Sequence, residues 1–396
     1  MERIENNVIS VVSQDICCGC GACINICPQE ALSYSTDING FIFPQIDKLL
    51  CVNCGKCMKV CPAIHVNKSD SLEAFAAVAK DKKSLFASSS GGVFSVIANY
   101  ILKQGGIVYG CMMDDQFKVM HIRIDNKDQL PLLQKSKYVQ SNLKSTYHLI
   151  QSDLNKGLTV LFSGTPCQVS AVKNYTSNNA NLITIDIVCH GVPSQFLFDR
   201  YLSYLKEKRG ELEKYEFRTK RIINNGMNWF FSYKLKSQKK AIVKNWPQDI
   251  YTYLYMKGYI NRESCYNCKY TTKERPGDFT LCDYWKWENY HSCFDRNGTV
   301  SGILCNTQKA VGLLDLIKSN LMIEETDINN IIKHNSCLEK PVEKPERRDF
   351  VLKTINEVGF NVLDMDYRKK NRLNIIKNNI RMMLPQKMVN LINGIL

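Results

Sequence analysis

The sequence lacks the features of a membrane protein, a secreted protein or a nucleic-acid-binding protein. No segment approaches the ~18 to 20 consecutive apolar residues that a membrane-spanning helix requires. Residues 1–7 contain no apolar core of a secretory signal, and nothing in the chain resembles a nucleic-acid-binding module. We therefore expect a cytoplasmic protein with no nucleic-acid partner.

Cysteine, in contrast, is abundant, with 18 among the 396 residues. In a reducing cytoplasm, this number is typical of metal ligands rather than of disulfides. The length allows two or three domains, and 44% hydrophobic residues is ordinary for a globular protein. From the distribution of motifs we expect four regions, at residues 1–70, 71–155, 156–345 and 346–396.

Two runs near the N-terminus repeat one cysteine spacing. Each contains C-x2-C-x2-C-x3-C-P, first at residues 17–28 and again at residues 51–62. This is the spacing of bacterial ferredoxins with two 4Fe–4S clusters, in which the fourth cysteine of each run binds the other cluster. The sequence therefore predicts an electron-transfer module. One expected ligand set is Cys17, Cys20, Cys23 and Cys61, and the other is Cys51, Cys54, Cys57 and Cys27.

The residues between these cysteines fit a loop that curls closely around a cluster. Gly19, Gly21 and Ala22 in the first run and Gly55 in the second are all small. Zinc is the alternative metal, but zinc sites pair two C-x2-C knuckles and need no third cysteine at the same gap. Cys18 is out of phase with the repeat and is interpreted as a spare thiol.

The signals after residue 70 predict an α/β (α+β) body with a mixed or parallel sheet. Residues 74–79 and 107–111 are expected to be strands on either side of a helix at 91–104, which ends at a pair of glycines. A clearer unit is a strand at 158–162, a turn into a helix and a strand at 182–188. Strand, helix and strand form a βαβ unit with parallel strands.

Cys167 and Cys189 each follow one strand of this unit. Parallel strands end at the same edge of a sheet, where open α/β sheets place their sites, so both cysteines are expected at that edge. With the C-x2-C pair Cys265 and Cys268, they could complete a third 4Fe–4S site. Two alternatives stay open: Cys167 and Cys189 as buried small apolar residues, and the pair as ligands of structural zinc.

The segment Ser88-Ser89-Ser90-Gly91-Gly92 opens the helix expected at 91–104. Small residues at a helix N-terminus expose backbone N–H groups and the positive end of the helix dipole, which suits a phosphate such as the pyrophosphate of a flavin. A serine N-cap followed by glycines for close packing explains the segment equally well.

These motifs, in this order, resemble the coenzyme F420 hydrogenase/dehydrogenase β-subunit family in its form with a fused N-terminal ferredoxin. Besides the segments already named, the resemblance rests on residues 136–141, 162–168, 186–193, 264–268 and 278–285, and it covers roughly residues 10–310. It implies FAD beside a 4Fe–4S cluster held by Cys167, Cys189, Cys265 and Cys268. The implied candidate flavin contacts are Ser88, Ser89, Ser90, Gly91, Gly92, Ser136, Lys137, Tyr138, Gln140, Gly164 and Thr165.

His190 adjoins one of these cysteines and is a candidate proton donor. It could instead hydrogen-bond a cluster sulfur or the backbone and tune a potential, which is the role we favour because no substrate geometry supports acid–base work. The sequence assigns no role to Cys111, Cys282, Cys293, Cys305 and Cys337.

The resemblance implies an iron–sulfur flavoprotein oxidoreductase that passes electrons between its clusters and FAD to reduce or oxidise an organic substrate. Bacterial relatives of this form are linked to surface-polysaccharide biosynthesis, which points to a sugar intermediate as the small-molecule substrate. The alternatives are a non-catalytic electron-transfer subunit of a larger redox complex and a true F420-dependent oxidoreductase. The expected electron donor is an acidic ferredoxin or flavodoxin-like protein, or a partner redox enzyme.

The net charge of +14 is concentrated at the C-terminus. Residues 367–396 hold seven basic and no acidic residues, whereas residues 1–70 hold five basic and seven acidic ones. Apolar residues at helical spacing between these basic residues predict an amphipathic helix, which could lie on the inner face of the membrane. The alternative is a helix docked on its own domain or on a partner. The apolar residues are Leu373, Ile376, Ile380, Met383 and Leu384.

Overall fold

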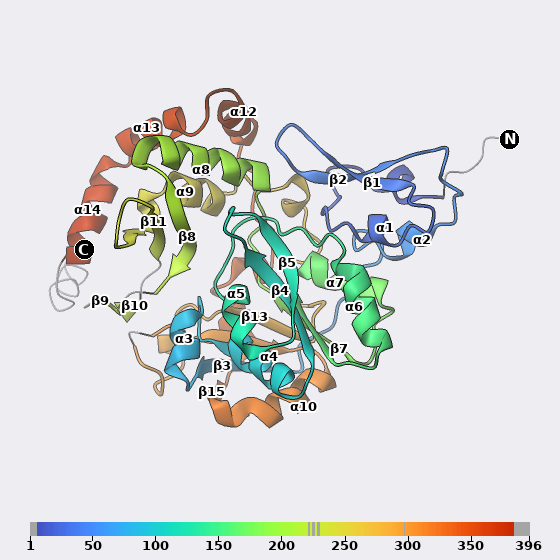
Figure 1. Ribbon diagram of the computed structural model, residues 1–396. Helices are drawn as coiled ribbons and strands as arrows, with labels where there is room; N and C mark the ends of the chain where they lie inside the picture. Colours follow the sequence, from blue (N-terminus) through green and yellow to red (C-terminus); the bar gives the residue numbers. More distant parts are fainter. Residues whose placement is uncertain (1–5, 221, 224–225, 228–229, 297, 384–396) are drawn as a thin grey trace.

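The computed structural model describes residues 6–220, 222–223, 226–227, 230–296 and 298–383 (Figure 1). Its N-terminal part is a small module in which a hairpin lies beside two single-turn helices. The hairpin is antiparallel and pairs Leu32 with Ile46 at its open end. The elements of the module are α1 (Ala22–Asn25), β1 (Leu32–Thr36), β2 (Ile42–Ile46) and α2 (Lys56–Lys59).

The body is built around a large mixed sheet with the strand order β15-β3-β14-β13-β7-β6-β4-β5. Strands β4, β6, β7 and β13 run parallel to one another, and the remaining pairings are antiparallel. The α/β prediction and the parallel βαβ unit are therefore confirmed. The strands are β3 (Glu73–Ala79), β4 (Ile107–Met113), β5 (Val119–Ile124), β6 (Val160–Gly164), β7 (Leu182–Ile187), β13 (Phe279–Asp283), β14 (Ser301–Cys305) and β15 (Leu321–Glu325).

Helices cover both faces of this sheet, and side chains alternate between the faces along each strand. In β6, Leu161 packs with α4 and α10 on one face, while Val160 and Phe162 pack with α6 and α7 on the other. Burial on both faces explains why the central strands are apolar nearly throughout. The helices around the sheet are α3 (Lys82–Ala87), α4 (Val93–Lys103), α5 (Leu130–Leu133), α6 (Thr146–Asn155), α7 (Pro166–Tyr175), α10 (Gln308–Ile317) and α11 (Ile328–Ile332).

The helix expected at 91–104 is α4, and its ends follow from two glycines. Gly92 has a φ of +89°, a left-handed conformation that places it outside the helix, so α4 begins at Val93. At the other end Gly105, with a φ of +77°, follows the cap residue Gln104. The short strand after it, β4, continues two residues beyond the expected end, to Met113.

A second core lies beside the sheet and is dominated by aromatic rings. Tyr201, Tyr251 and Phe360 contact one another there with ring centroids 5.1 to 6.5 Å apart. They come from α8, α9 and the turn between α12 and α13, so the C-terminal helices are packed into the same core as α8 and α9. The elements are α8 (Gln195–Arg209), β8 (Leu212–Thr219), β9 (Ile222–Ile223), β10 (Gly226–Met227), β11 (Phe230–Leu235), β12 (Ile242–Asn245), α9 (Ile250–Met256), α12 (Arg348–Val358), α13 (Asn361–Lys370) and α14 (Arg372–Met383).

The C-terminal helix α14 is docked on the body through a face that the apolar spacing did not indicate. Ile375 packs against the aromatic core, and Asn379 accepts a hydrogen bond from Gln248. The predicted apolar stripe faces outward instead, with Leu373, Ile376 and Ile380 exposed to 75%, 43% and 51%. Leu384 lies outside the described residues, and contact of this stripe with a membrane stays a prediction.

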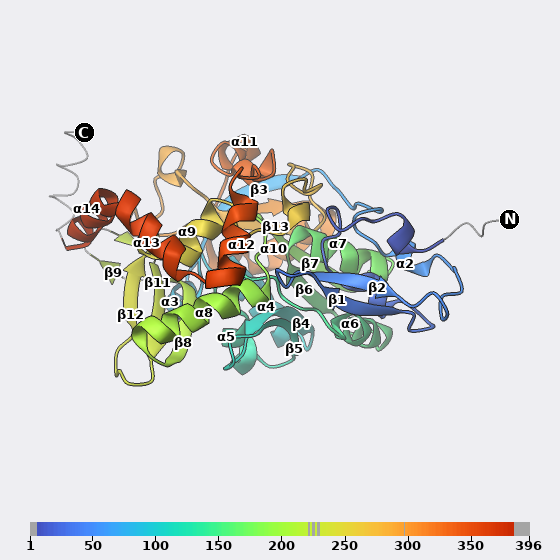
Figure 2. The same cartoon turned by 90° about the horizontal axis from the view of Figure 1, so that it is seen from above.

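The N-terminal module and the C-terminal helix α14 are far apart in the molecule. The N-terminal module and α14 lie at opposite ends in both views (Figures 1 and 2). None of the helices in the described part of the chain has the length and apolar composition needed to cross a bilayer.

Candidate iron–sulfur and cofactor site

The first cysteine run of the module surrounds a small internal cavity. Cys17, Cys20 and Cys23 line it together with Cys61 from the end of the second run. Gly19 and Gly21 have φ values of +65° and +76°, which bend the chain around this space at little steric cost. The structure thus groups Cys61 with the first run.

The second run surrounds a matching cavity farther from the body. Cys51, Cys54 and Cys57 line it together with Cys27 from the end of the first run. Gly55 has a φ of +71°, and the N–H of Val8 donates to Cys57 Sγ over 3.3 Å. Cys54 is exposed, whereas Cys20 at the equivalent position of the first run is buried. Ligation of iron by either group stays a prediction.

The four cysteines of the body, Cys167, Cys189, Cys265 and Cys268, line a single larger cavity of about 550 Å³. Cys167 stands in the first turn of α7 directly after β6, and Cys189 follows β7, so both lie at the carboxyl edge of the parallel strands. Burial raises the pKa of Cys189 well above its usual value, and the charges of the other three cysteines add to that rise. The body cysteines are therefore within electrostatic reach of one another.

Cys18 lies between the first module cavity and the body cavity and lines both. Its thiol influences the pKa of Cys167 and of Cys20 on either side. Interaction with Cys18 lowers the pKa of Cys167 to about 7, against the opposing effect of burial. The residue interpreted as a spare thiol thus connects the two cavities, although its spacing keeps it out of the expected ligand sets.

The described residues include no group of three or more His, Cys, Asp or Glu side chains close enough for a single metal ion. The cysteines instead stand around cavities, with open space between their thiols. A 4Fe–4S cluster is bound by four thiolates that converge on a cube of iron and sulfide rather than on one ion. The residues therefore fit a cluster in each of the three cavities.

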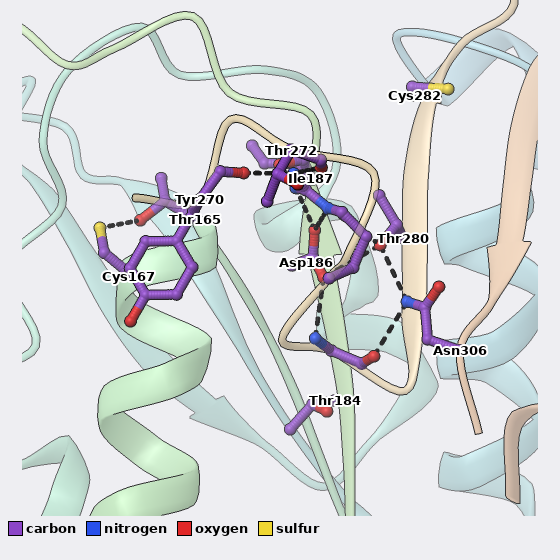
Figure 3. Close-up of polar contacts among 12 residues, drawn as sticks. Thr165, Cys167, Thr184, Asp186, Ile187, Tyr270, Thr272, Thr280, Cys282 and Asn306 are labelled. Carbon is purple, nitrogen blue, oxygen red and sulfur yellow. Dashed lines mark hydrogen bonds and ion pairs between the residues drawn. The ribbon is translucent and has the colours of Figure 1, made fainter. Parts of the chain in front are cut away.

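A buried ion pair fixes the loop that follows Cys265 and Cys268, and Figure 3 shows its carboxylate, Asp186, beside Tyr270 and Thr272 of that loop. Arg275 pairs with Asp186 of β7, and the side chains are 1% and 0% exposed. The guanidinium also donates to the carbonyl oxygens of Tyr270 and Thr272 over 2.6 and 3.3 Å. A carboxylate of β7 thus holds the loop next to the end of the strand that leads to Cys189.

The second Asp186 oxygen completes this anchor. Asp186 Oδ2 accepts hydrogen bonds from Gly277 N over 2.9 Å and Thr280 Oγ1 over 3.0 Å (Figure 3). Sequence reasoning missed this role. The available signal was one aspartate inside an otherwise apolar strand, since an acidic residue is almost never fully buried unless it is paired.

The N-terminus of α4 opens into the same cavity. Gly92, Val93 and Phe94 line it, and in the described structure no side chain caps this helix. Its first N–H groups therefore point to the cavity at the positive end of the helix dipole. Two lysines lie nearby: Lys137 lines the cavity, and Lys220 Nζ donates to the carbonyls of Leu85 and Ser90. Burial lowers the pKa of Lys137 to about 8 and that of Lys220 to about 7.

Several predicted flavin contacts already bind protein groups. The hydroxyls of Ser88 and Ser90 donate to the carbonyls of Ser84 and Val300, and Ser89 Oγ accepts from Ser136 N and Oγ. Gly91 is not among the residues that line the cavity, and its N–H donates to Ser301 Oγ over 2.8 Å. The other candidates line the cavity: Lys137 Nζ contacts three carbonyls, while Gly164 ends β6 and Thr165 precedes α7. The residues fit a phosphate through backbone N–H groups more directly than through serine hydroxyls.

Arg262 joins the module to the body at the edge of the cavity. Its guanidinium donates to Cys17 O over 2.7 Å and Ile42 O over 2.6 Å, both in the module. It also donates to Gln140 Oε1 over 3.2 Å, and Gln140 Nε2 in turn donates to Cys18 O over 2.8 Å. The candidate flavin contact Gln140 therefore uses its amide to hold the first cysteine run.

Models of known protein families match three ranges of the chain. Residues 16–64 and 43–108 match two models of 4Fe–4S dicluster domains. Residues 157–331 match the model of the C-terminal part of the coenzyme F420 hydrogenase/dehydrogenase β-subunit. This segment belongs to the F420 hydrogenase/dehydrogenase β-subunit family. Its range contains Cys167, Cys189, Cys265 and Cys268, so the family resemblance and the iron–sulfur character of the N-terminal module are confirmed.

One solved structure to which this chain is similar is a chain of the F420-reducing NiFe hydrogenase complex from Methanosarcina barkeri. It has 15% sequence identity and a TM-score of 0.44, with 78% of this chain and 92% of that chain covered. No curated protein is significantly similar to the sequence.

Within the β-subunit domain, His190 is held by the backbone. One ring nitrogen, Nε2, lies 3.0 Å from the carbonyl oxygen of Met256, and the other, Nδ1, lies 3.9 Å from Cys337 Sγ. Burial lowers its pKa. A neutral ring that donates Nε2–H to a carbonyl fits the favoured structural role, and proton transfer by His190 stays a prediction.

The unassigned cysteines divide into two groups. Cys111, Cys282 and Cys337 line the cavity, and burial raises the pKa of Cys282 to about 12. Cys305 is buried in β14, and Cys293 is exposed. A protonated, buried thiol is a small apolar residue, so none of these observations gives the group a ligand role.

Proposed function

We propose that the chain is an iron–sulfur flavoprotein oxidoreductase that passes electrons between 4Fe–4S clusters and FAD and thereby reduces or oxidises an organic substrate. The observation that carries this proposal is the single cavity at the carboxyl edge of the sheet. It is lined by the body cysteines, by the uncapped N-terminus of α4 and by Cys18 of the N-terminal module. An electron carrier and an anionic cofactor would therefore meet in one enclosed space.

In this proposal, the cysteines act in three sets. The first module set is Cys17, Cys20, Cys23 and Cys61, the second is Cys51, Cys54, Cys57 and Cys27, and the body set is Cys167, Cys189, Cys265 and Cys268. Arg275 and Asp186 keep the loop of the body set in place, and Arg262 and Gln140 keep the first module set against the cavity. The regions are proposed to divide at residues 70, 155 and 345.

The size of the same cavity is that of a cofactor pocket. Its volume of about 550 Å³ lies within the ~300–1,000 Å³ of cofactor and ligand pockets. The first N–H groups of α4 would hold the pyrophosphate of FAD, with Lys137 nearby as a cation. Bound flavin supplies the exchange between one-electron and two-electron chemistry. Tyr138, stacked on Tyr255 with ring centroids 4.8 Å apart, gives the cavity an aromatic wall.

The substrate and donor follow by analogy with the family. A sugar intermediate of surface-polysaccharide biosynthesis is the proposed substrate, and an acidic ferredoxin or flavodoxin-like protein is the proposed donor. The exposed Cys54 and the apolar Leu49 and Val52 beside it, exposed to 95% and 62%, form a surface on which such a donor would dock near the second set. Interface cores are rich in apolar contacts of this kind.

The test is the content of iron, sulfide and flavin in full-length protein purified without oxygen. The expected result is about twelve irons and one FAD per chain, because three clusters of four irons are proposed. About eight irons without flavin would overturn the proposal and leave an electron-transfer subunit built on an unexplained scaffold.

A variant tests the flavin position separately. Ser89→Glu places a carboxylate in the cavity beside the N-terminus of α4, where it would repel a pyrophosphate. We expect loss of flavin with all irons retained. The matched control, Ser152→Glu on the exposed face of α6, should keep both. Full flavin content in Ser89→Glu would show that the pyrophosphate is held elsewhere.

A further inference from the structure

Arg262 is a buried cation at the junction of the two cavities. Its side chain is 1% exposed, and its guanidinium lies over the ring of Phe43 with 4.4 Å to the ring centroid. Its hydrogen-bond partners are Cys17 O, Ile42 O and Gln140 Oε1, which are neutral acceptors. Within the described parts of the chain, no carboxylate pairs with it, and the neighbouring Glu263 pairs with Lys344 and Arg348 instead.

A buried charge without a counter-ion is costly, because it loses hydration without gaining a partner of opposite sign. Aromatic faces and carbonyl oxygens offset part of this cost. Arg262 contacts residues of two different cysteine sets. Its guanidinium donates to the carbonyl oxygen of Cys17 in the first module set, and its side chain lines the body cavity together with Cys167 and Cys265 of the body set.

We propose that Arg262 is the shared counter-ion of the first module cluster and the body cluster, and that it locks the module against the body at their junction. The proposal rests on the function proposed above. A 4Fe–4S cluster bound by four thiolates is anionic, so the clusters would supply the negative charge that the protein does not. A fixed positive charge favours the more negative, reduced state of a nearby cluster and therefore raises its reduction potential.

The second module set lies outside this arrangement. The cation that lines its cavity is Lys56, which is exposed, and the hydrogen bonds of Arg262 to the module go to Cys17 of the first set and to Ile42. Exposed charges act through water and have small effects. Arg262 is thus a positioning residue that acts on two clusters out of three.

The test is a redox titration of full-length protein followed by electron paramagnetic resonance, with the potential of each cluster measured in wild type and variants. Arg262→Gln removes the charge, and we expect more negative potentials for the first module cluster and the body cluster. The second module cluster should keep its potential, as an internal control. Arg262→Lys keeps the charge and should stay close to wild type. In Arg200→Gln, which also loses an arginine bound to backbone carbonyls but far from the cysteines, all three potentials should be unchanged.

A second variant covers the case in which Arg262→Gln does not fold. Gln140→Glu leaves Arg262 in place and sets a carboxylate at the position that now accepts its hydrogen bond over 3.2 Å. Neutralisation of the charge should again make both potentials more negative. Unchanged potentials in the charge-removing variants, or an equal shift of all three clusters, would overturn the proposal.

Iron analysis of the same samples separates this proposal from the function on which it rests. Wild-type protein with about eight irons would contradict the body cluster. The first module cluster would still report whether Arg262 sets its potential.

Discussion

The N-terminal module and the β-subunit domain both gather cysteines around a cavity, but they do so by different means. In the module, each set takes three cysteines from one short run and the fourth from the other run. In the β-subunit domain, the set comes from the end of β6, the end of β7 and a loop held by Arg275. The module sets are therefore defined by local spacing, whereas the body set exists only when the parallel strands have paired.

Removal of one body cysteine should have the largest effect and should separate the two kinds of site. Cys189→Ala is expected to lower the iron content from about twelve to about eight per chain, because the body cluster loses a ligand while the module keeps its own. Cys305→Ala, at a buried cysteine of β14 away from the cavity, is the control and should keep all irons. Full iron content in Cys189→Ala would contradict the body set.

Loss of the Arg275–Asp186 ion pair, which holds the loop of the body set, should have the next largest effect. Asp186→Asn leaves Arg275 buried without its carboxylate, and we expect a loss of about 3–5 kcal/mol in the free energy of unfolding. Urea denaturation would measure it, with the body cluster lost and the module clusters retained. The control is Asp125→Asn, which removes an exposed partner of Arg123 and should cost about 0–1 kcal/mol. Equal costs in the two variants would show that the buried pair is not the anchor.

The two module runs differ in their surroundings, and matched glycine substitutions should reveal it. Gly19 and Gly55 both have positive φ values, so alanine should cost about 1–2 kcal/mol at either position. At Gly19 the new Cβ would also lie 2.7 Å from a guanidinium nitrogen of Arg262 and 2.8 Å from the carbonyl oxygen of Ile42. At Gly55 the three nearest atoms would all belong to the side chain of Asn6, whose end is 2.8 Å away.

We therefore expect Gly19→Ala to be more destabilising than Gly55→Ala, by an overpacking term of about 1–3 kcal/mol in thermal or urea unfolding. The larger loss in Gly55→Ala would mean that the junction with the body tolerates a shift of the first run.

The smallest effect is expected at Cys18. Cys18→Ala removes a thiol that lines both cavities but stands outside the expected ligand spacing. The iron content should stay at about twelve per chain. A loss of about four irons would instead identify Cys18 as a ligand and change the composition of the first module set.

The parts of the molecule that follow from local patterns could be predicted from the sequence. The repeated C-x2-C-x2-C-x3-C-P spacing identified the module, and strand and helix signals around Pro166 identified the parallel unit that brings Cys167 and Cys189 to one edge. Both are encoded over a few tens of residues, within the reach of periodicity and spacing arguments.

The contacts that complete the site could not be predicted, because they join distant positions. Asp186 and Arg275 are 89 residues apart, Gln140 and Cys18 are 122 apart, and Arg262 and Cys17 are 245 apart. From sequence alone, a buried polar side chain cannot be distinguished from a surface residue, because its hydrogen-bond partner is known only once the fold is known. The same holds for α14. Its apolar spacing predicted that one face of the helix would be buried, but Ile375, on another face, packs against the aromatic core.

The close fit of Arg262 to the first run bears on the transfer of modules between proteins. A ferredoxin grafted in place of the N-terminal module would need a glycine where Gly19 stands and carbonyl oxygens that meet the guanidinium at the positions of Cys17 and Ile42. A donor with a larger residue at that position would drive a side chain into Arg262, and a donor whose loop follows another path would leave that buried cation without acceptors. Such a donor must be redesigned together with position 262.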